Sequence, residues 1–288
     1  MMHFDPMTDS ASLPGEGAPP VLRAIGLVRR FGGLTAVDQV SIELHAGQLH
    51  AVIGTNGAGK STLINMLSGE IAMSKGTIEL LGQDVSGWSQ PHRARHGIGR
   101  SYQRTTIFPE LTVLENCRLT AQAAHQRPWL LWQTASGCAK AQPAATQALE
   151  QAGLSTVAAR IAGTLSHGQK RQLEIAMCLA THPKVLLLDE PLAGMGAEES
   201  ERMLRLLEKL KQTHAVLLVE HDMDAVFRVA DRITVMINGS VIASDTPSRI
   251  RTDPLVRSAY LGLEETVVQA LDQTPGQANG EAVTAAPC

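Results

Sequence analysis

The first half of the chain is organised by short runs of apolar and β-branched residues separated by glycine. Five of these runs have the length and composition of β-strands, and a glycine-containing turn at 45–47 separates two of them. One run, L-H-A-V-I-G, leads into a glycine-rich segment and then into S-T-L-I-N-M-L-S, whose apolar spacing predicts a helix that stops at Gly69. The strands are predicted at 21–28, 39–44, 48–53, 76–81 and 98–102.

The second half alternates strands with helices. The run K-V-L-L-L-D-E at 184–190 is almost wholly apolar, which is typical of a parallel strand buried on both faces, and A-V-L-L-V-E-H repeats the pattern. Helices are predicted near 224–229 and at 197–212, where acidic residues come first and lysines last. An N-G pair at 238–239, between two β-rich runs, predicts a hairpin. These alternations predict a doubly wound parallel sheet with antiparallel strands added on its N-terminal side.

Between the two halves the composition changes. Residues 111–162 are rich in Ala, Gln and Leu, and the spacing of Ala144, Ala148, Gln151 and Ala152 predicts a helix. Both ends of the chain are rich in small residues, proline and glycine, which predicts disorder. The predicted layout is a disordered tail at 1–20, one ordered domain at 21–263 whose helical subdomain occupies about 104–168, and a disordered tail at 264–288.

The glycine-rich segment carries the strongest chemical signal. It reads G-T-N-G-A-G-K-S and matches G-x-x-x-x-G-K-[ST] in full. Glycines let the backbone wrap around phosphates, successive N–H groups form an anion nest, and the next helix adds its positive N-terminal end. Since the motif follows a predicted strand and opens a predicted helix, we prefer this interpretation to a chance glycine loop. The predicted nucleotide-binding residues are Gly54, Asn56, Gly57, Ala58, Gly59, Lys60, Ser61 and Thr62, with Lys60 reaching the β- and γ-phosphates and Ser61 binding Mg²⁺.

A second signal lies at the end of the apolar run V-L-L-L-D-E-P. Open α/β sheets bind ligands at the carboxyl ends of their strands, which is where Asp189 and Glu190 fall. Asp189 is therefore predicted to help hold Mg²⁺, and Glu190 to act as the general base toward the attacking water. Alone, the D-E-P sequence would suggest only a strand end; the phosphate loop upstream makes the catalytic interpretation the stronger one.

The segment L-S-H-G-Q at 165–169 places a serine beside a histidine, as in a hydrolase dyad. Consecutive residues at a helix start diverge by roughly 100° around the axis, so a direct hydrogen bond between Ser166 and His167 is not expected. Ser-x-x-Gln is instead a capping box, with Ser166 at the N-cap and Gln169 at N3, and it predicts a second anion-binding helix start. The stripe Leu173, Ala176, Met177 and Ala180 continues that helix, with Lys170 and Arg171 expected on its outer face.

Composition narrows the class of protein. The formal net charge of −3 gives no general electrostatic case for nucleic acid or an anionic membrane. Four unpaired cysteines indicate reduced thiols in a cytosolic protein, and the histidines lack metal-ligand spacing, so no structural metal is expected. No apolar run of about 18 residues and no basic, apolar leader is present, so neither a membrane span nor a secretory signal is predicted.

The chain carries, in this order, the phosphate loop, L-S-x-G-Q, L-L-L-D-E-P and a histidine after the next strand. This set of motifs resembles the ATP-binding subunit of an ABC transporter over about residues 21–263. The resemblance implies a P-loop NTPase (RecA-like) parallel-sheet core with an antiparallel β subdomain and an inserted α-helical subdomain. It implies that Gln103 senses Mg²⁺, that His221 is the switch histidine at the γ-phosphate, and that Phe31 stacks on adenine. A structural core role stays open for Phe31.

In that family the L-S-x-G-Q helix start contacts the γ-phosphate held by the opposite subunit, which assigns this contact to Ser166, Gly168 and Gln169. The phrases R-F-G-G-L, E-L-T-V-L-E-N, Q-L-E-I-A and D-E-P-L-A-G-M resemble the branched-chain amino-acid importers, which share some of them with urea importers. His167 stands where the family usually has glycine, and we expect it to face solvent or an interface without chemistry. No acidic residue precedes Glu198 in the loop after Glu190, where the family commonly carries an aspartate.

The resemblance predicts a cytoplasmic ATPase, peripheral on the inner membrane, that hydrolyses ATP with Mg²⁺. Its expected partners are a second ATPase subunit, either an identical copy or a paralogue, two separate membrane permeases and, through them, a periplasmic or extracellular solute-binding protein. An importer of urea or of a related amide or amino acid is the alternative of the same class. A soluble ABC-type ATPase acting on nucleic acid or ribosomes is disfavoured, since the chain has one ATPase unit, no long heptad run and no basic excess.

Overall fold

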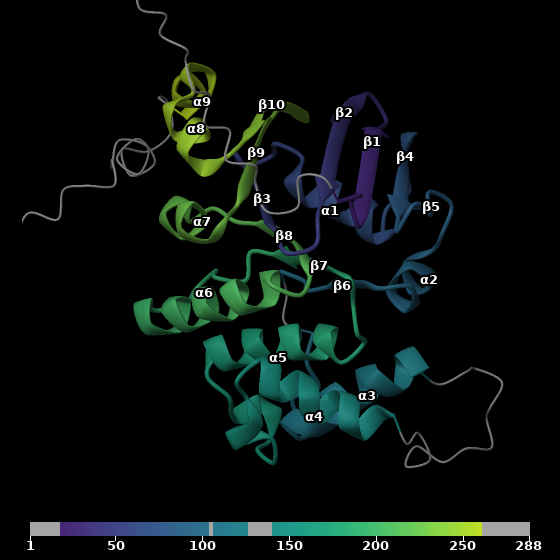
Figure 1. The fold of residues 1–288 in the computed structure, drawn as a ribbon, viewed down its shortest axis with the longest axis vertical. Helices are drawn as coiled ribbons and strands as arrows, with labels where there is room; N and C mark the ends of the chain where they lie inside the picture. The colour runs from purple at the N-terminus through teal and green to yellow at the C-terminus, as the bar shows by residue number, and fades with distance from the viewer. Residues whose placement is uncertain (1–17, 104–105, 126–139, 261–288) are drawn as a thin grey trace, which may run out of the picture.

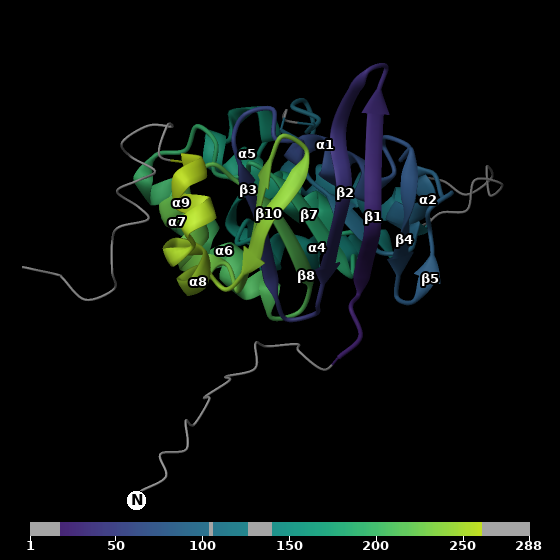
Figure 2. The same cartoon turned by 90° about the horizontal axis from the view of Figure 1, so that it is seen from above.

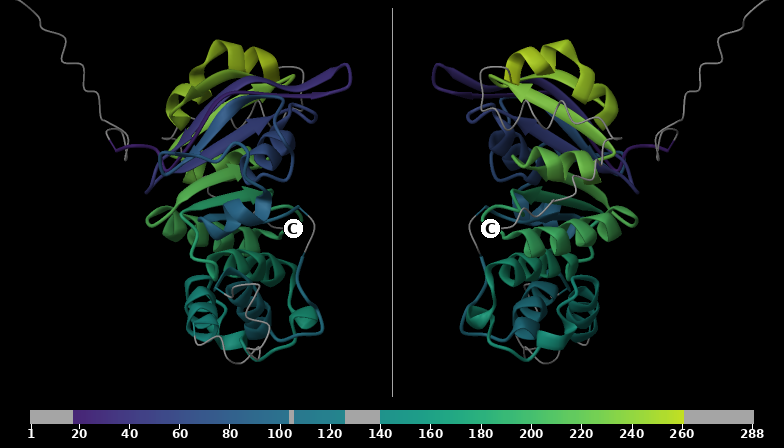
Figure 3. Two further views of the ribbon diagram at one scale, coloured as in Figure 1. Left: turned by 90° about the vertical axis from the view of Figure 1, so that its right-hand side faces the viewer. Right: turned by 90° about the vertical axis from the view of Figure 1, so that its left-hand side faces the viewer.

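Two sheets, one mostly parallel and one antiparallel, carry helices on both sides and a helical lobe at one end (Figures 1 and 3). The computed structural model describes residues 18–103, 106–125 and 140–260. The tail predicted at 264–288 and most of the one predicted at 1–20 lie outside these residues, as does the start of the predicted subdomain at 104–105. The predicted domain limits therefore stay predictions.

The central sheet has six strands in the order β10-β9-β3-β8-β7-β6. Its β3, β6, β7, β8 and β9 run parallel, and β10 closes the predicted hairpin at Asn238-Gly239 antiparallel to β9. The strand order therefore confirms the doubly wound α/β prediction. The bounds are β3 Leu49–Gly54, β6 Ile98–Arg100, β7 Val185–Asp189, β8 Ala215–Val219, β9 Arg232–Ile237 and β10 Ser240–Asp245.

The antiparallel sheet has four strands in the order β2-β1-β4-β5 and comes from the N-terminal part of the chain, as predicted. In the view from above (Figure 2), the long β1–β2 hairpin lies alongside the rest of the body. The second strand of this hairpin starts at residue 34 rather than at 39, since its pairing with β1 continues past several register shifts to the Phe31–Leu34 turn. The bounds are β1 Leu22–Phe31, β2 Leu34–Leu44, β4 Lys75–Leu80 and β5 Gln83–Asp84.

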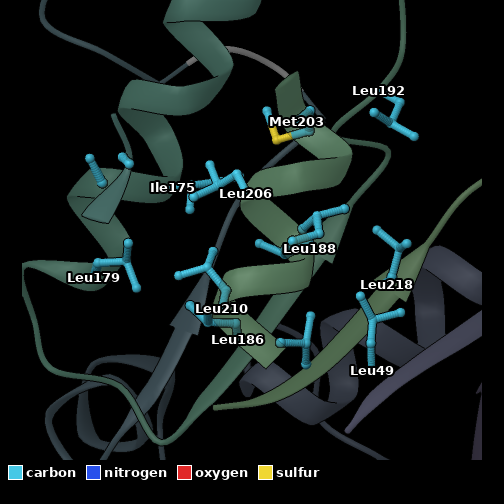
Figure 4. Close-up of a cluster of buried hydrophobic side chains, with 14 of the residues drawn as sticks. Leu49, Ile175, Leu179, Leu186, Leu188, Leu192, Met203, Leu206, Leu210 and Leu218 are labelled. Atoms are coloured by element: carbon cyan, nitrogen blue, oxygen red, sulfur yellow. The ribbon is translucent and has the colours of Figure 1, made fainter. Parts of the chain in front are cut away.

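Helices cover both faces of the central sheet, which explains its nearly continuous apolar strands. In β7, Val185 and Leu187 face α1 and the antiparallel sheet, while Leu186 and Leu188 face α5 and α6. Figure 4 shows the second of these clusters, where leucines of the sheet meet Ile175 and apolar residues of α6. The bounds are α1 Lys60–Ser68, α2 Gln90–Arg95, α5 His167–Leu179, α6 Ala197–Lys211, α7 Met223–Val229, α8 Pro247–Thr252 and α9 Pro254–Tyr260.

Within the described residues, the helical lobe between β6 and α5 comprises α3, α4 and short 3₁₀ turns (Figure 1). The predicted helix is present as α4, in which Ala144 and Ala148 are buried; Ala152, which follows it, is buried as well, whereas Gln151 is exposed. Helices α3 and α4 pack on α5. Small alanine side chains let these helices lie close together. The bounds are α3 Val113–His125, α4 Ala141–Gln151, η2 Ser155–Val157 and η3 Ala162–Thr164.

Two predictions about this region are wrong. The strand predicted at 98–102 ends at Arg100, so Gln103 lies three residues beyond its end. Arg171 does not lie on the outer face of α5: it is 7% exposed, donates to the carbonyls of Tyr102 and Gln103, and pairs with Glu174 at 3.0 Å. The segment after β6 crosses over α5 and needs a donor for its carbonyls, which a helical periodicity does not reveal.

The buried side chain of His50 in β3 makes the fold sensitive to acid. Its Nδ1 donates to the Glu43 carbonyl at 3.1 Å, so its Nε2 accepts from the Thr234 hydroxyl at 2.8 Å. This arrangement needs the neutral ring. Burial lowers the pKa of His50 from its ordinary 6.5 to about 4. Unfolding exposes the ring to water, where it binds a proton more readily than in the fold.

We predict that the free energy of unfolding is highest above pH 6.5 and falls as the pH drops toward 4, with His50 contributing about 3 kcal/mol of that loss. The comparison is between the wild-type chain and His50→Gln, measured by urea unfolding at several pH values. Between pH 6.5 and 4, the free energy of unfolding should depend less steeply on pH in His50→Gln, by an amount that corresponds to close to one bound proton. Parallel curves for the two proteins would contradict this assignment.

Candidate functional site

The glycine loop between β3 and α1 is forced into a shape that only glycine allows at its two ends. Gly54 has φ of 156° and Gly59 has φ of 97°. A Cβ at Gly54 would lie 2.1 Å from the Met236 carbonyl oxygen, and one at Gly59 would lie 2.3 Å from the Ala36 carbonyl oxygen. Backbone from β9 and β2 therefore holds the loop at both ends. On the loop's outer side, a Cβ at Gly57 would meet nothing within 4 Å, which leaves space for a phosphate chain.

Lys60 begins α1 and turns its ammonium back over this loop. The side chain is buried, and Nζ donates to the Gly54 carbonyl at 2.7 Å and to the Thr55 carbonyl at 3.0 Å. Burial lowers its pKa, while the nearby carboxylates of Glu190 and Asp189 oppose that shift. The ammonium therefore lies near the carboxylates of Glu190 and Asp189 and close to the inner face of the loop.

The other predicted loop residues divide between surface and core. Asn56 and Ser61 are exposed and Thr62 is partly exposed, so their side chains are accessible from the loop's outer side. Ala58 differs, since its side chain packs in the core with α1 and the antiparallel sheet. Only the backbone of Ala58 is therefore available to a ligand.

Glu190 lies at the centre of the site, immediately after β7. Its Oε1 is 2.7 Å from Nε2 of His221, which follows β8, and its Oε2 accepts from the amide of Gln103 at 3.0 Å. The backbone of Glu190 is in the left-handed region, with φ of 50°, a conformation that is unfavourable for a side-chain residue and is concentrated at functional sites. Three residues that are far apart in sequence therefore meet at the carboxyl end of the parallel sheet.

Asp189 lies deeper and is incompletely satisfied. Its Oδ1 is buried without a hydrogen-bond partner, and its Oδ2 is 4.0 Å from the Arg100 guanidinium. Burial raises the pKa of this carboxyl, with Arg100 as the main opposing charge. An unpartnered carboxylate oxygen close to Lys60 and the start of α1 fits a site for a hard divalent cation, which prefers oxygen ligands.

Two residues of this neighbourhood were not predicted. Arg100 ends β6 and binds Glu70 at 2.5 Å as well as Ser68 and Asn65 of α1, so it links the strand to the phosphate-loop helix. Glu220 directly follows β8 and is 3% exposed. A signal for Glu220 exists in the sequence, because an acid directly follows the apolar run A-V-L-L-V. Arg100 carries no such signal.

Glu220 connects the segment that follows β7 with the segment that follows β8 through backbone hydrogen bonds. Its Oε1 accepts from the N–H of Leu192 at 2.7 Å, in the loop after Glu190, and its Oε2 accepts from the N–H of His221 at 3.1 Å. Burial raises the pKa of Glu220 to about 7. Both oxygens face N–H donors, so the arrangement is suited to the ionised carboxylate.

The L-S-H-G-Q helix start lies on the other side of the sheet from α1 (Figure 1). The capping box is confirmed: the N–H of Gln169 donates to Ser166 Oγ at 3.3 Å, and the Gln169 side chain accepts from the N–H of Ser166 at 3.2 Å. Ser166 Oγ donates to Glu199 at 2.7 Å and not to His167, whose Nε2 instead donates to the Ala193 carbonyl at 3.0 Å. His167 is exposed as expected, but it is attached to the loop that follows Glu190.

Phe31, at the end of β1, is 43% exposed, and the Arg29 guanidinium lies 4.4 Å from its ring centre. It is therefore no core residue, and its ring is accessible to a planar ligand. Over the described residues there is no cluster of three or more metal-ligating side chains. None of the helices described here has the length and apolarity needed to cross a membrane.

We predict that Glu220→Ala lowers the free energy of unfolding by about 2 to 4 kcal/mol, because the buried N–H of Leu192 and the part-buried N–H of His221 lose their acceptor. Urea unfolding at constant pH measures this change in the free energy of unfolding. Asp224→Ala is the matched control, since Asp224 is an exposed acid in the first turn of α7 and its loss should change stability by less than about 1 kcal/mol. Equal effects of the two substitutions would show that Glu220 does not hold the segments together.

Comparisons with known proteins agree with this geometry. The ABC transporter family model matches residues 37–193, and a model described as branched-chain amino acid ATP-binding cassette transporter matches residues 240–266. The branched-chain amino acid transport ATP-binding protein BraF of Pseudomonas aeruginosa is 40% identical over 255 residues, covering 84% of this chain and 98% of BraF. LivG of Escherichia coli, of the same description, is 41% identical over 251 residues, with the same two coverages.

A solved nucleotide-free ATP-binding cassette of an ABC transporter has a TM-score of 0.74 and 31% identity to this chain, covering 84% of it and 98% of that structure. The match therefore extends over the fold, the phosphate loop and the C-terminal segment together. The chain belongs to the ABC transporter family, as one of its ATP-binding, ATP-hydrolysing subunits.

Proposed function

We propose that this subunit hydrolyses MgATP to energise the uptake of branched-chain amino acids across the cell's inner membrane. The observation that carries the catalytic part is the meeting of Gln103, Glu190 and His221 at the carboxyl end of the sheet. The substrate class is supported by BraF and LivG and by the match of residues 240–266 to the branched-chain amino acid model.

ATP binding is assigned to the loop and its flanking residues. The N–H groups of 54–62 and the start of α1 attract the phosphates, and Lys60 exchanges its contacts with the Gly54 and Thr55 carbonyls for contacts with the β- and γ-phosphates. The exposed ring of Phe31 stacks on adenine. Ser61, Asp189 and Gln103 hold Mg²⁺, which neutralises phosphate charge when bound; the unpartnered Oδ1 of Asp189 fits that role.

Hydrolysis is assigned to Glu190 as the general base. A carboxylate that already accepts from Gln103 is oriented to take a proton from water at the γ-phosphate. His221, 2.7 Å from the same carboxylate, can hold its position and contact the γ-phosphate as the switch residue. Glu220 is then a positioning residue, because it fixes the backbone on both sides of this pair.

Transport requires that ATP change how two subunits associate. We assign Ser166, Gly168 and Gln169 to the γ-phosphate held by a partner subunit, either a second copy or a paralogue. ATP then bridges the two subunits, and hydrolysis removes the bridge, so the nucleotide favours the closed pair by differential affinity. Two permease subunits and a solute-binding protein complete the proposed transporter, which places this chain at the cytoplasmic face of the membrane.

We predict that Glu190→Gln keeps ATP binding but reduces steady-state hydrolysis at least about 100-fold, because the water loses its base while the phosphate contacts persist. Retained ATP after gel filtration and phosphate release measure the two effects. Lys60→Ala is the comparison variant, in which ATP retention itself should be lost. Normal hydrolysis by Glu190→Gln would refute the role of Glu190.

We also predict that the transporter reconstituted in proteoliposomes accumulates radiolabelled leucine in the presence of ATP and does not accumulate urea. A transporter reconstituted with Lys60→Ala, which should not retain ATP, gives the background uptake. Uptake of urea without leucine would assign the chain to the urea importers, while leaving the ATPase assignment intact.

A further inference from the structure

The helix start assigned above to the partner's γ-phosphate already carries an anionic side chain of the same chain. Glu199, in the first turn of α6, accepts a hydrogen bond from Ser166 Oγ at 2.7 Å. It also accepts from the backbone N–H of Gly168, and both bonds lower the pKa of Glu199, so its carboxylate is ionised at neutral pH. The donors that the proposed function offers to a phosphate are therefore taken by a carboxylate.

The contact is close enough to explain the glycine at 168. A Cβ at Gly168 would lie 2.6 Å from the Glu199 carboxyl carbon and 2.9 Å from its Cβ, so any side chain there would displace Glu199. The carboxylate thus lies directly against the first turn of α5, in a recess of about 370 Å³ that Gln172 and Arg202 also line. Of the two acids that open α6, only Glu199 reaches it; the side chain of Glu198 is 90% exposed and faces Arg202 at 3.7 Å.

We propose that Glu199 is a built-in competitor of the partner's γ-phosphate, which must leave Ser166 and Gly168 before two subunits can close on ATP. This inference rests on the in-trans assignment of Ser166 and Gly168. Two anions cannot share the same Oγ–H and N–H donors, and their like charges repel. In a subunit without a nucleotide-bearing partner, Ser166 and Gly168 therefore keep their hydrogen bonds to Glu199.

Release of Glu199 has a local consequence. The helix that carries Glu199 continues directly from the loop after Glu190, and His167 joins that loop to α5 through the Ala193 carbonyl. Closure at the helix start is thus connected by covalent and hydrogen-bonded backbone to the catalytic base of the same subunit.

The test uses the assembled transporter, in which pairing does not depend on whether the chain associates with itself. The ATP concentration giving half-maximal hydrolysis is measured for wild type, Glu199→Gln and Glu198→Gln, without transported solute. Glu199→Gln should lower that concentration about fivefold, as expected for removing one charge-assisted contact that opposes closure. Glu198→Gln removes the same charge one residue earlier and should leave it unchanged.

The direction of the effect separates this role from a structural one. If Glu199 only capped α5, its loss would lower the thermal midpoint of the isolated subunit and would not make ATP more effective. A half-maximal concentration that is unchanged or raised in Glu199→Gln, or lowered equally in Glu198→Gln, overturns the inference. Glu199→Ala is measured alongside, so that a folding defect of one variant does not decide the result.

Ser166→Arg distinguishes failure of this inference from failure of its premise. If Ser166→Arg abolishes hydrolysis while Glu199→Gln behaves as wild type, the partner site stands and the competitor role is wrong. If Ser166→Arg hydrolyses ATP normally, the in-trans assignment itself is wrong, and the competitor role is overturned with it.

Discussion

Burial of β7 on both faces is the constraint on which the rest of the structure depends. Every residue from Val185 to Asp189 is buried. Asp189 and the following Glu190 lie where this strand ends, at the carboxyl edge of the sheet. Its neighbours β6 and β8 run parallel to it, so their ends meet there as well. Parallel pairing thus converts three distant stretches of sequence into one site.

Several carboxylates lie together in the candidate site, and the cost of bringing them together depends on the cations and N–H donors around them. Asp189, Glu190 and Glu220 lie close together, opposed by Lys60, Arg100 and His221. The carboxylates with raised pKa, Asp189 and Glu220, are those that burial desolvates most. Glu220 is compensated by two N–H donors, whereas Asp189 keeps one oxygen unpaired. In the proposed function, a bound Mg²⁺ would supply the partner that this oxygen lacks.

The two helix starts that we propose as phosphate sites differ in the structure. At α1 the loop's outer side is open, and Lys60 occupies the inner side through carbonyl contacts. At α5 the N-terminal donors are satisfied by Ser166, by Gln169 and by Glu199 from a neighbouring helix. In the proposed function, the start of α1 binds the phosphates of this chain's own nucleotide. The start of α5 would bind the partner's γ-phosphate only after Glu199 has left its donors.

The sequence by itself determined the features that depend on short-range pattern. Strand and helix periodicity placed most strands of both sheets and the helices α1, α4, α5, α6 and α7, and S-x-x-Q specified the capping box. The spacing of the phosphate loop and of the D-E pair indicated the candidate site. Each of these features is set by residues a few positions apart. Only the tertiary structure decided which side chains from distant elements meet. Arg171 is buried because the segment after β6 crosses α5, Glu220 joins two loops, and Glu199 reaches Ser166 because α6 packs against α5. These contacts depend on how elements pack, and local periodicity carries no information about a partner supplied by another part of the chain.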